Sequence, residues 1–386
     1  MNITLPPLSL YIHIPWCVQK CPYCDFNSHA QKGIIPEEDY IQHLLKDLHQ
    51  DLIRHQSAIQ QRKLHSIFIG GGTPSLFSPQ SIAYLLNEIK QLIDFYDNIE
   101  ITLEANPGTA EAEKFIGYAE AGVNRLSMGI QSFEPEKLLK LGRIHDGNEA
   151  KQAVRFAQHS AKFGLKSFNM DLMHGLPNQS VDQALSDLKQ AVELSPPHLS
   201  WYQLTIEPNT LYYYRPPTLP DDDDLWDIFE QGHQILTNAG YEQYETSAYA
   251  KKGFQCKHNL NYWRFGDYLA IGCGSHGKIS YSNGEIYRFN KTKHPKGYMR
   301  GDYLYEENQI EIDDRSFEYF MNRFRLLEAT PKIEFEQYTG LNRNSVTLEI
   351  EKAIEKGYII DTINHWQITH KGKLFLNELL TIFLKD

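Results

Sequence analysis

The sequence has few cysteines, no long apolar run and no excess of basic residues. Among its 386 residues are five cysteines, an odd number unlike the disulfide framework of a secreted domain. No stretch approaches the roughly 20 apolar residues that span a bilayer, and residues 1–9 lack the basic and apolar regions of a signal peptide. We therefore expect a cytoplasmic protein without a transmembrane segment.

The charge balance is acidic, with 38 Lys and Arg against 49 Asp and Glu and a formal net charge of −11. Nucleic acids and anionic lipids repel such a chain unless basic residues are concentrated in one patch, and the sequence has no such concentration. Its 41% apolar content predicts a folded chain of two or three domains rather than a disordered one.

Short β-rich runs alternate with amphipathic helical stretches between residues 8 and 207, which is typical of β/α units around a parallel sheet or barrel. The clearest helical stretch, Glu37–Gln60, follows Pro36, has acidic residues in its first turn and carries leucines spaced for one buried face. Six runs predict strands: Leu8–Ile14, Ser66–Ile69, Glu100–Leu103, Arg125–Ile130, Ser167–Leu172 and His198–Thr205.

Polar and glycine-rich residues gather just after each of these strands. The six segments read IHIPWC, IGGGTP, LEANPG, MGIQSF, MDLMHGLP and LTIEPN. Because the carboxyl ends of parallel strands lie on the same side of a sheet, we expect these segments to meet at one site. Any one of them taken alone is better explained by an ordinary turn.

The pattern changes beyond Asn209. The acidic run Asp221–Asp224 predicts the solvent-exposed start of a helix near Leu225, and it lacks the alternating ligands and loop glycine of a calcium site. From about Ser316 the order is helix, helix, hairpin and helix, which is a winged-helix pattern. Residues 306–386 contain 10 Lys and Arg against 15 Asp and Glu, so we expect a structural or protein-contact role rather than DNA binding.

Three of the five cysteines crowd into eight residues, where Cys17, Cys21 and Cys24 form C-x₃-C-x₂-C. Three soft thiolates with one open coordination position suit an iron–sulfur cluster that leaves one iron free for a ligand. One alternative is a structural zinc that recruits a distant histidine as its fourth ligand. The other is burial as small apolar residues, which the intervening Lys20 and Pro22 fit badly.

The segment YIHIPWCVQKCPYCDF, with Tyr23 just before its last cysteine, and the segment IGGGTP resemble the radical S-adenosylmethionine superfamily. The resemblance implies a partial (β/α)₆ barrel in which Cys17, Cys21 and Cys24 hold a [4Fe–4S] cluster. In that superfamily the open iron binds the amino and carboxylate groups of S-adenosyl-L-methionine, and one electron from the cluster generates a 5′-deoxyadenosyl radical. A reductant such as a flavodoxin is an implied partner.

The other strand-end residues fit the same ligand. Gly71 and Gly72 let the backbone approach an amino acid moiety, and Thr73 adds a hydroxyl. The structural alternatives are a tight turn at the glycines, a surface ion pair at Arg143 and a turn cap at Asp171. The match to the coproporphyrinogen oxidase-like branch of the superfamily implies S-adenosylmethionine-binding roles for Tyr11, Tyr23, Glu104, Gln131, Arg143 and Asp171.

Over its whole length, the chain resembles the haem chaperones of this branch. The segment CKHNLNYWRFGDYLAIGCGSHG contains H-N-x-x-Y-W, the haem-binding signature by which those chaperones resemble one another. Imidazole is a common axial ligand of haem iron, and flat aromatic rings suit a porphyrin face, although a hydrogen-bonded core histidine is the structural alternative. The signature residues are His258, Asn259, Tyr262 and Trp263. The rival iron ligands nearby are Cys256, Cys273 and His276.

This resemblance implies a chaperone that binds haem and passes it to haem-dependent, respiratory acceptors, with no catalytic residue required. The alternative is an oxygen-independent coproporphyrinogen III oxidase, which forms protoporphyrinogen IX by radical decarboxylation. Oxidases of this branch carry an N-terminal arm ahead of the cluster loop, and with 16 residues before Cys17 we expect none here. A nucleic-acid-binding protein that uses the tail is the weakest hypothesis.

The expected organisation has three parts. Residues 1–235 form the radical S-adenosylmethionine core, residues 236–304 carry the haem motif, and residues 305–386 form an α+β winged-helix-like module. The sequence leaves the oligomeric state open, a homodimer included.

Overall fold

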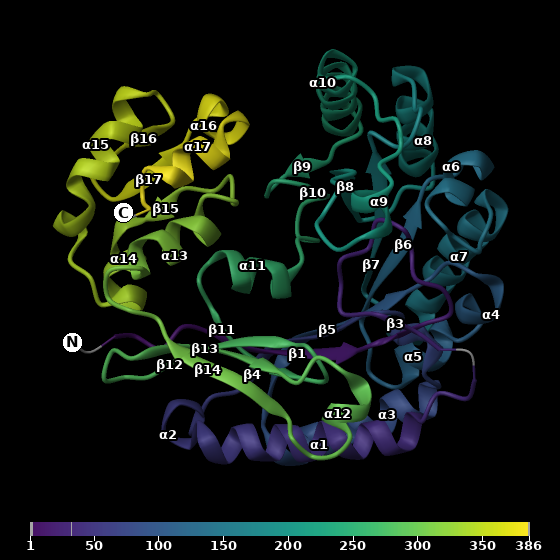
Figure 1. The fold of residues 1–386 in the computed structure, drawn as a ribbon, viewed down its shortest axis with the longest axis horizontal. Coiled ribbons are helices and arrows are strands. Elements are labelled where there is room, and N and C mark those ends of the chain that lie inside the picture. Colours follow the sequence, from purple (N-terminus) through teal and green to yellow (C-terminus); the bar gives the residue numbers. More distant parts are fainter. Residues whose placement is uncertain (1–2, 32, 385–386) are drawn as a thin grey trace.

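The computed structural model describes residues 3–31 and 33–384, and a twelve-stranded sheet forms the centre of the described chain (Figure 1). The strand order is β14-β13-β12-β11-β1-β4-β5-β6-β7-β8-β10-β9. Six consecutive strands run parallel, which confirms the predicted partial (β/α)₆ core. They are β1 (Leu8–Ile14), β4 (Leu64–Gly71), β5 (Phe95–Ala105), β6 (Arg125–Gln131), β7 (Ser167–His174) and β8 (His198–Gln203).

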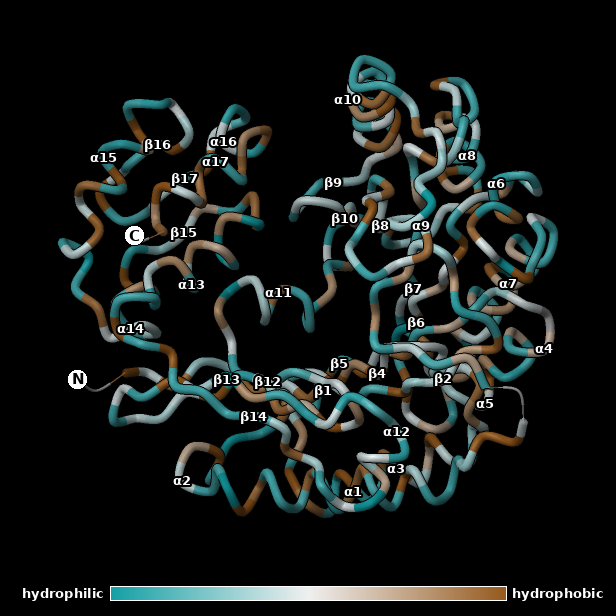
Figure 2. Tube along the Cα trace, viewed as in Figure 1, coloured by the Kyte–Doolittle hydropathy of each residue, from teal (hydrophilic) through white to brown (hydrophobic). Residues whose placement is uncertain are grey.

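Helices fill the connections between these strands and cover the outer face of the sheet (Figure 1). They are α1 (Glu37–Arg54), α2 (Gln56–Ile59), η1 (Pro74–Leu76), α3 (Pro79–Leu92), α4 (Thr109–Ala112), α5 (Phe115–Glu120), α6 (Pro135–Lys140), α7 (Gly147–Ser160), η2 (Ala161–Phe163) and α8 (Val181–Glu193). Along α1, hydrophobic and hydrophilic positions alternate as the predicted amphipathic pattern requires, and Leu44 and Leu48 are fully buried (Figure 2).

The helix predicted over residues 37–60 is wrong in its length, because α1 ends at Arg54. His55 interrupts it with φ −102° and ψ 22°, and α2 follows as a separate turn. The buried His55 ring packs on Phe289, and its Nδ1 atom is hydrogen-bonded to the Tyr281 hydroxyl at 2.7 Å. The helix thus ends where His55 contacts two residues that are far away in the sequence.

Strands added later in the chain extend both edges of the same sheet. After β8 the chain forms α9 (Leu211–Tyr214), α10 (Asp222–Asn238), β9 (Glu242–Gln243) and β10 (Ala248–Ala250). It then forms α11 (Lys257–Trp263), β11 (Asp267–Ile271), β12 (His276–Ser280), β13 (Ile286–Lys291), α12 (Pro295–Tyr298) and β14 (Leu304–Gln309). Strand β11 pairs parallel with β1, and β12 to β14 continue antiparallel.

The acidic run forms the exposed first turn of α10, as predicted, but the helix starts at Asp222 rather than near Leu225. The Asp221 side chain caps it by accepting a hydrogen bond from the Asp224 backbone N–H at 2.9 Å. Carboxylates at this position interact favourably with the positive end of the helix dipole.

The C-terminal module lies on the side of the sheet away from α1 (Figure 1). It consists of α13 (Arg315–Arg323), β15 (Thr330–Pro331), α14 (Lys332–Thr339), η3 (Arg343–Val346), α15 (Thr347–Glu355), β16 (Ile359–Asp361), β17 (His365–Ile368), α16 (His370–Leu374) and α17 (Leu376–Thr381). Its own core includes the packed rings of Phe320, Phe335 and Trp366. The predicted hairpin followed by a helix is confirmed, but three α-helices rather than two precede the hairpin, and the last helix divides at Phe375.

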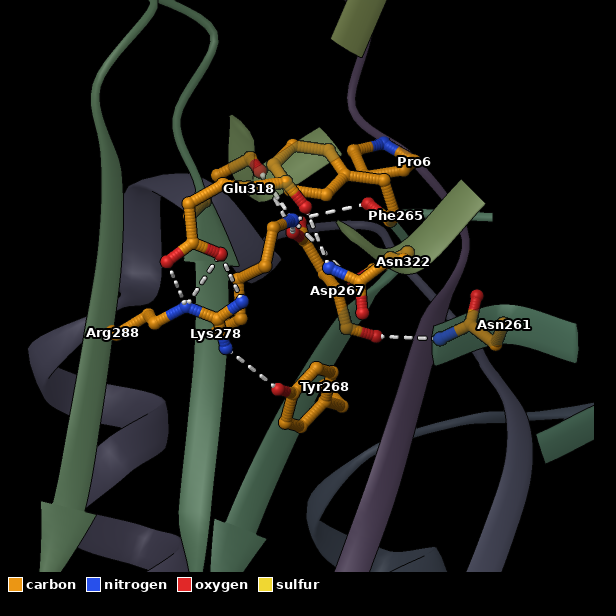
Figure 3. A network of polar contacts seen from close by, with 12 residues as sticks. Pro6, Asn261, Phe265, Asp267, Tyr268, Lys278, Arg288, Glu318 and Asn322 are labelled. Atoms are coloured by element: carbon orange, nitrogen blue, oxygen red, sulfur yellow. Dashed lines mark hydrogen bonds and ion pairs between the residues drawn. The ribbon is translucent and has the colours of Figure 1, made fainter. Parts of the chain in front are cut away.

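A polar network fixes this module to the sheet (Figure 3). Buried Asp267 on β11 pairs with Lys278 on β12 at 3.0 Å, and Arg288 on β13 pairs with Glu318 on α13. Arg288 also donates a hydrogen bond of 3.1 Å to the Tyr268 hydroxyl. The network thereby orients Tyr268 as well as joining the two parts.

None of the helices within residues 3–31 and 33–384 combines the length and the apolar character needed to cross a membrane. The domain boundaries expected at residues 235 and 304 stay a prediction.

Helix α10 packs against Trp201 at Gly232, where a Cβ atom would lie 1.9 Å from Cη2 of the indole. We expect Gly232→Ala to lower the free energy of unfolding by about 1–3 kcal/mol, because the ring or the helix must shift. Urea unfolding followed by circular dichroism measures this change. Gln231→Ala, on the exposed face of the same helix, is the control and should change stability by less than about 0.5 kcal/mol. Equal unfolding midpoints for the two variants would show this contact to be unimportant.

Candidate functional site

A cavity of about 430 Å³ lies at the carboxyl ends of the parallel strands. Every one of the six strands, or the loop that follows it, contributes to its lining, so the predicted convergence is confirmed. The predicted residues that line it are Cys17, Cys21, Tyr23, Cys24, Gly71, Gly72, Thr73, Glu104, Gln131, Arg143 and Asp171.

The cysteine loop is held at its base by a two-stranded parallel ribbon, β2 (Trp16–Cys17) with β3 (His29–Ala30). The backbone N–H of Cys24 donates to the Cys21 carbonyl at 3.2 Å, which folds the loop back on itself. All three cysteines are free, and burial raises the pKa of the Cys17 and Cys24 thiols. Metal binding at this loop must therefore release protons.

A cluster and a single metal ion require different arrangements of donors. No group of three or more His, Cys, Asp or Glu side chains in the described part of the chain is placed to hold one metal ion, so the zinc alternative is not supported. A [4Fe–4S] cluster takes its thiolates at separate irons and does not need them to converge on one point. Three cysteines around one cavity fit such a cluster.

Arg143 places a cation beside this loop, with Nη1 3.7 Å from the Cys21 sulfur. Its Nη2 atom donates to Asn106 Oδ1 and to the Gly129 carbonyl, both at 2.7 Å. Neutral oxygens inside the cavity thus hold the guanidinium, and the structure does not support the alternative of a surface ion pair. Apart from its place in the LEANPG segment, no sequence pattern singles out Asn106.

The deep end of the cavity is acidic. Glu104 accepts a hydrogen bond of 2.9 Å from the Gly71 backbone N–H, and burial, followed by the nearby Asp171 carboxylate, raises the pKa of Glu104 to about 8. Burial also raises the pKa of Asp171, which accepts hydrogen bonds from Asn169 at 2.8 Å and Ser127 at 3.2 Å. Asp171 lies within strand β7, so it does not cap a turn. Two carboxyl groups in one buried wall suit an ammonium group and hydroxyls.

Gln131 adopts a left-handed backbone conformation with φ +67°, which is rare for a residue other than glycine. Its Oε1 atom accepts a hydrogen bond of 2.9 Å from the Tyr202 hydroxyl on β8. Strain of this kind persists where surrounding contacts enforce it, commonly at ligand sites. No sequence pattern distinguishes Tyr202 from the other residues of the predicted strand His198–Thr205.

The chain's own packing requires the glycines after β4. At Gly71, φ is +117° and a Cβ atom would lie 2.6 Å from the His13 ring. At Gly72, a Cβ atom would lie 2.6 Å from the Trp16 carbonyl oxygen. The structure therefore supports the tight-turn alternative. The ligand-approach role stays a prediction, with which the position of the same backbone in the cavity wall is compatible.

A second cavity, of about 740 Å³, adjoins the first one. Asp25, Phe26, Ser28, Gly71 and Glu104 line both cavities and form their common wall. The rest of the second cavity is rich in aromatic and basic side chains, and it includes one predicted S-adenosylmethionine-binding residue and three of the predicted haem residues. These lining residues are Tyr11, Tyr262, Trp263, Tyr268, His276, Lys20 and Lys293.

The other predicted haem residues do not reach this cavity. His258 is 1% exposed, and its two ring nitrogens are hydrogen-bonded to the Ser66 and Tyr262 hydroxyls, both at 2.9 Å. Asn259 is half-buried on the same helix. Cys256 and Cys273 are fully buried, and burial raises the pKa of each thiol to about 12.

Comparison with known proteins agrees with this geometry. The model of the radical SAM superfamily matches residues 11–189, and the model of the HemN C-terminal domain matches residues 311–375. A protein of Haemophilus influenzae named "Heme chaperone HemW" is 72% identical over 99% of both chains. The protein of the same name from Escherichia coli is 60% identical over 100% of both chains. The chain belongs to the HemW family.

A solved structure extends the comparison to the HemW fold as a whole. Coproporphyrinogen III oxidase (HemN) from Escherichia coli, described as a radical SAM enzyme, superposes with a TM-score of 0.80 over 98% of this chain and 90% of its own. At 22% identity this likeness shows a common fold. Core and C-terminal module are therefore arranged in this chain as in that oxidase, and function must be argued from the sites.

We expect Glu104→Gln to stabilise the cluster-free protein and to weaken its binding of S-adenosylmethionine. Because the folded-state pKa of Glu104 is raised, the wild type loses stability as the pH rises from about 4.5 to about 8, and an amide does not. At pH 9 the variant should unfold at a higher temperature by circular dichroism. Calorimetric titration of the cluster-loaded variant should give at least about tenfold weaker binding, since a neutral amide oxygen is a weaker acceptor for the amino N–H than a carboxylate.

The matched control is Glu193→Gln on the exposed end of α8, which should change neither quantity. Unaltered S-adenosylmethionine affinity in Glu104→Gln would remove this residue from the binding site.

Proposed function

We propose that the protein is a haem chaperone that binds haem and transfers it to haem-dependent acceptor proteins. The observation that carries this proposal is the second cavity, where Tyr262 and Trp263 of the haem motif line a space directly beside the cysteine loop. Its volume of about 740 Å³ lies within the range typical of cofactor sites. Two relatives, 72% and 60% identical over 99% and 100% of both chains, are named heme chaperones, which supports the proposal.

The first cavity is the proposed site of the cofactors. Cys17, Cys21 and Cys24 would hold a [4Fe–4S] cluster, which when bound supplies an electron for the cleavage of S-adenosylmethionine. Glu104 would accept a hydrogen bond from the amino group of the ligand, and Asp171 and Gln131 would contact its hydroxyls. Arg143 would keep a positive charge next to the thiolate of Cys21. Tyr23 and Thr73 complete the wall on the cluster side.

For Tyr11 we propose a role that differs from the predicted contact with S-adenosylmethionine. It lines the second cavity together with Gly71 and Glu104, and its hydroxyl is hydrogen-bonded to His13 Nδ1 at 3.0 Å. We place its contact on the haem side of the common wall rather than on S-adenosylmethionine.

The partners inferred from the resemblance are respiratory haem proteins as acceptors and a flavodoxin-like reductant for the cluster. A homodimer, the absence of nucleic-acid binding and the cytoplasmic location stay predictions from the sequence.

The alternative function is oxygen-independent oxidation of coproporphyrinogen III. The observation in its favour is the fold shared with the HemN oxidase at a TM-score of 0.80, with a porphyrin-sized cavity beside the cysteine loop. The haem-chaperone names of the relatives at 72% and 60% identity favour the chaperone.

Anaerobically purified, cluster-loaded protein titrated with haemin should show a Soret band that saturates at one equivalent. The same protein, incubated with S-adenosylmethionine, a reductant and coproporphyrinogen III, should form no vinyl-bearing product. Haem-loaded protein mixed with a haem-free b-type cytochrome should lose its haem to that acceptor. Absence of stoichiometric binding would reject the chaperone, and product formation at catalytic rates would establish the oxidase.

A triple variant that combines Cys17→Ala, Cys21→Ala and Cys24→Ala tests the link between the two cavities. It should contain neither iron nor sulfide, and its haem affinity should fall several-fold, because three residues that follow Cys24 belong to the common wall. Lys189→Ala on the exposed surface of α8 is a control for handling and should retain both properties. Full iron and sulfide content in the triple variant would show that the cluster is bound elsewhere.

A further inference from the structure

The four candidate iron ligands of the haem segment have very different surroundings. His258 would be the first choice from its place in the motif, but its ring is enclosed between Ser66, Phe68 and Tyr262. Both of its nitrogens are engaged in hydrogen bonds, so iron binding would break the bond to the Ser66 or the Tyr262 hydroxyl. Its side chain therefore positions Tyr262 and does not face the cavity.

The two cysteines are no more accessible. The Cys256 thiol is fully buried and donates to the Glu100 carboxylate at 3.5 Å, so a thiolate there would face a negative charge. The Cys273 thiol is also fully buried, and the neighbouring Asn27 side chain covers it, donating to the Cys273 carbonyl at 2.9 Å. Neither sulfur lines the second cavity.

His276 differs from all three. It is exposed, it lines the second cavity, and within the described residues its ring has no hydrogen-bond partner. It is the first residue of β12, paired with Asn290 of β13, and the adjacent Ser275 carbonyl accepts a hydrogen bond of 2.9 Å from the Lys291 backbone N–H. A free imidazole on a fixed strand end is well prepared for an axial bond.

Two other histidines line this cavity and are less available. Both ring nitrogens of His13 are hydrogen-bonded, to the Tyr11 hydroxyl at 3.0 Å and to the Asn27 carbonyl at 2.9 Å. The His29 ring packs edge-on against His294 at 5.5 Å, and its Nε2 atom, although it has no hydrogen-bond partner, is buried.

The remaining walls suit the rest of a haem molecule. Tyr262 and Tyr268 pack edge to face at 4.3 Å and, with Trp263, offer aromatic area to a porphyrin ring. The side chains of Lys20 and Lys293 are exposed, and no acidic side chain in the described residues forms an ion pair with either. They can pair with the two propionate carboxylates of haem.

We propose that haem binds in the second cavity with His276 as the axial ligand of its iron, while His258 acts as a positioning residue for Tyr262. This inference rests on the proposed function, because it assigns the binding site for the haem that the chaperone carries. It also places the haem against the common wall, next to the S-adenosylmethionine site.

The test compares haemin titrations of cluster-loaded wild type, His276→Gly, His258→Ala and His29→Ala, with His49→Ala on the exposed face of α1 as the matched control. We expect His276→Gly to bind haemin at least about tenfold more weakly and to lose the imidazole-ligated signature in its Soret band and electron paramagnetic resonance spectrum. Added imidazole should restore that signature. His258→Ala, checked for folding by circular dichroism, should keep the signature with a lower affinity. His29→Ala should also keep the signature, and only His49→Ala should match the wild type in affinity.

The outcomes distinguish failure of the axial-ligand assignment from failure of the proposed chaperone function. If the wild type binds no haemin, the proposed function fails and the ligand assignment fails with it. If the wild type binds and His276→Gly is spectroscopically identical to it, the assignment is wrong while the chaperone function stands. Loss of the imidazole signature in folded His258→Ala or in His29→Ala, with His276→Gly unchanged, would transfer the axial bond to that residue.

Discussion

The parallel pairing of β1 with strands on both of its sides is the constraint on which the molecule depends. Strands β4 and β11 each run parallel to β1, so the segments that follow all three emerge at the same edge. The cysteine loop follows β1, the glycines end β4, and the turn to His276 follows β11. Reversal of either pairing would move one of these groups to the opposite end of the sheet, and the two cavities would lose their common side.

Local sequence patterns were sufficient for the order of the six parallel strands, because each run is rich in the residues that form buried strands. They were insufficient for element ends, which tertiary contacts decide. Strand β5 begins at Phe95, five residues before its predicted start, because Phe95 pairs with Leu64 of β4. The break at His55 likewise depends on Tyr281 and Phe289, and no pattern around residue 55 encodes them.

The site residues likewise divide into those that local sequence patterns predict and those that tertiary contacts decide. Residues directly after strands were predictable, since strand ends converge whatever their neighbours are. The structure places Tyr11 on the other side of Gly71, and it shows Asn106 and Tyr202 as partners of Arg143 and Gln131. These outcomes depend on pairs of side chains from different elements. The enclosure of His258 is the same kind of fact, because its partners Ser66 and Tyr262 come from a distant strand and from the next turn of its own helix.

The partition between the cavities is thin at Gly71, where no side chain can be added without displacing the His13 ring. Two occupants, one in each chamber, would touch opposite faces of the same peptide and of the Glu104 carboxyl group. Their binding free energies would then be linked. Because linkage is reciprocal, the factor by which the nucleotide changes the affinity for porphyrin equals the factor by which porphyrin changes the affinity for the nucleotide.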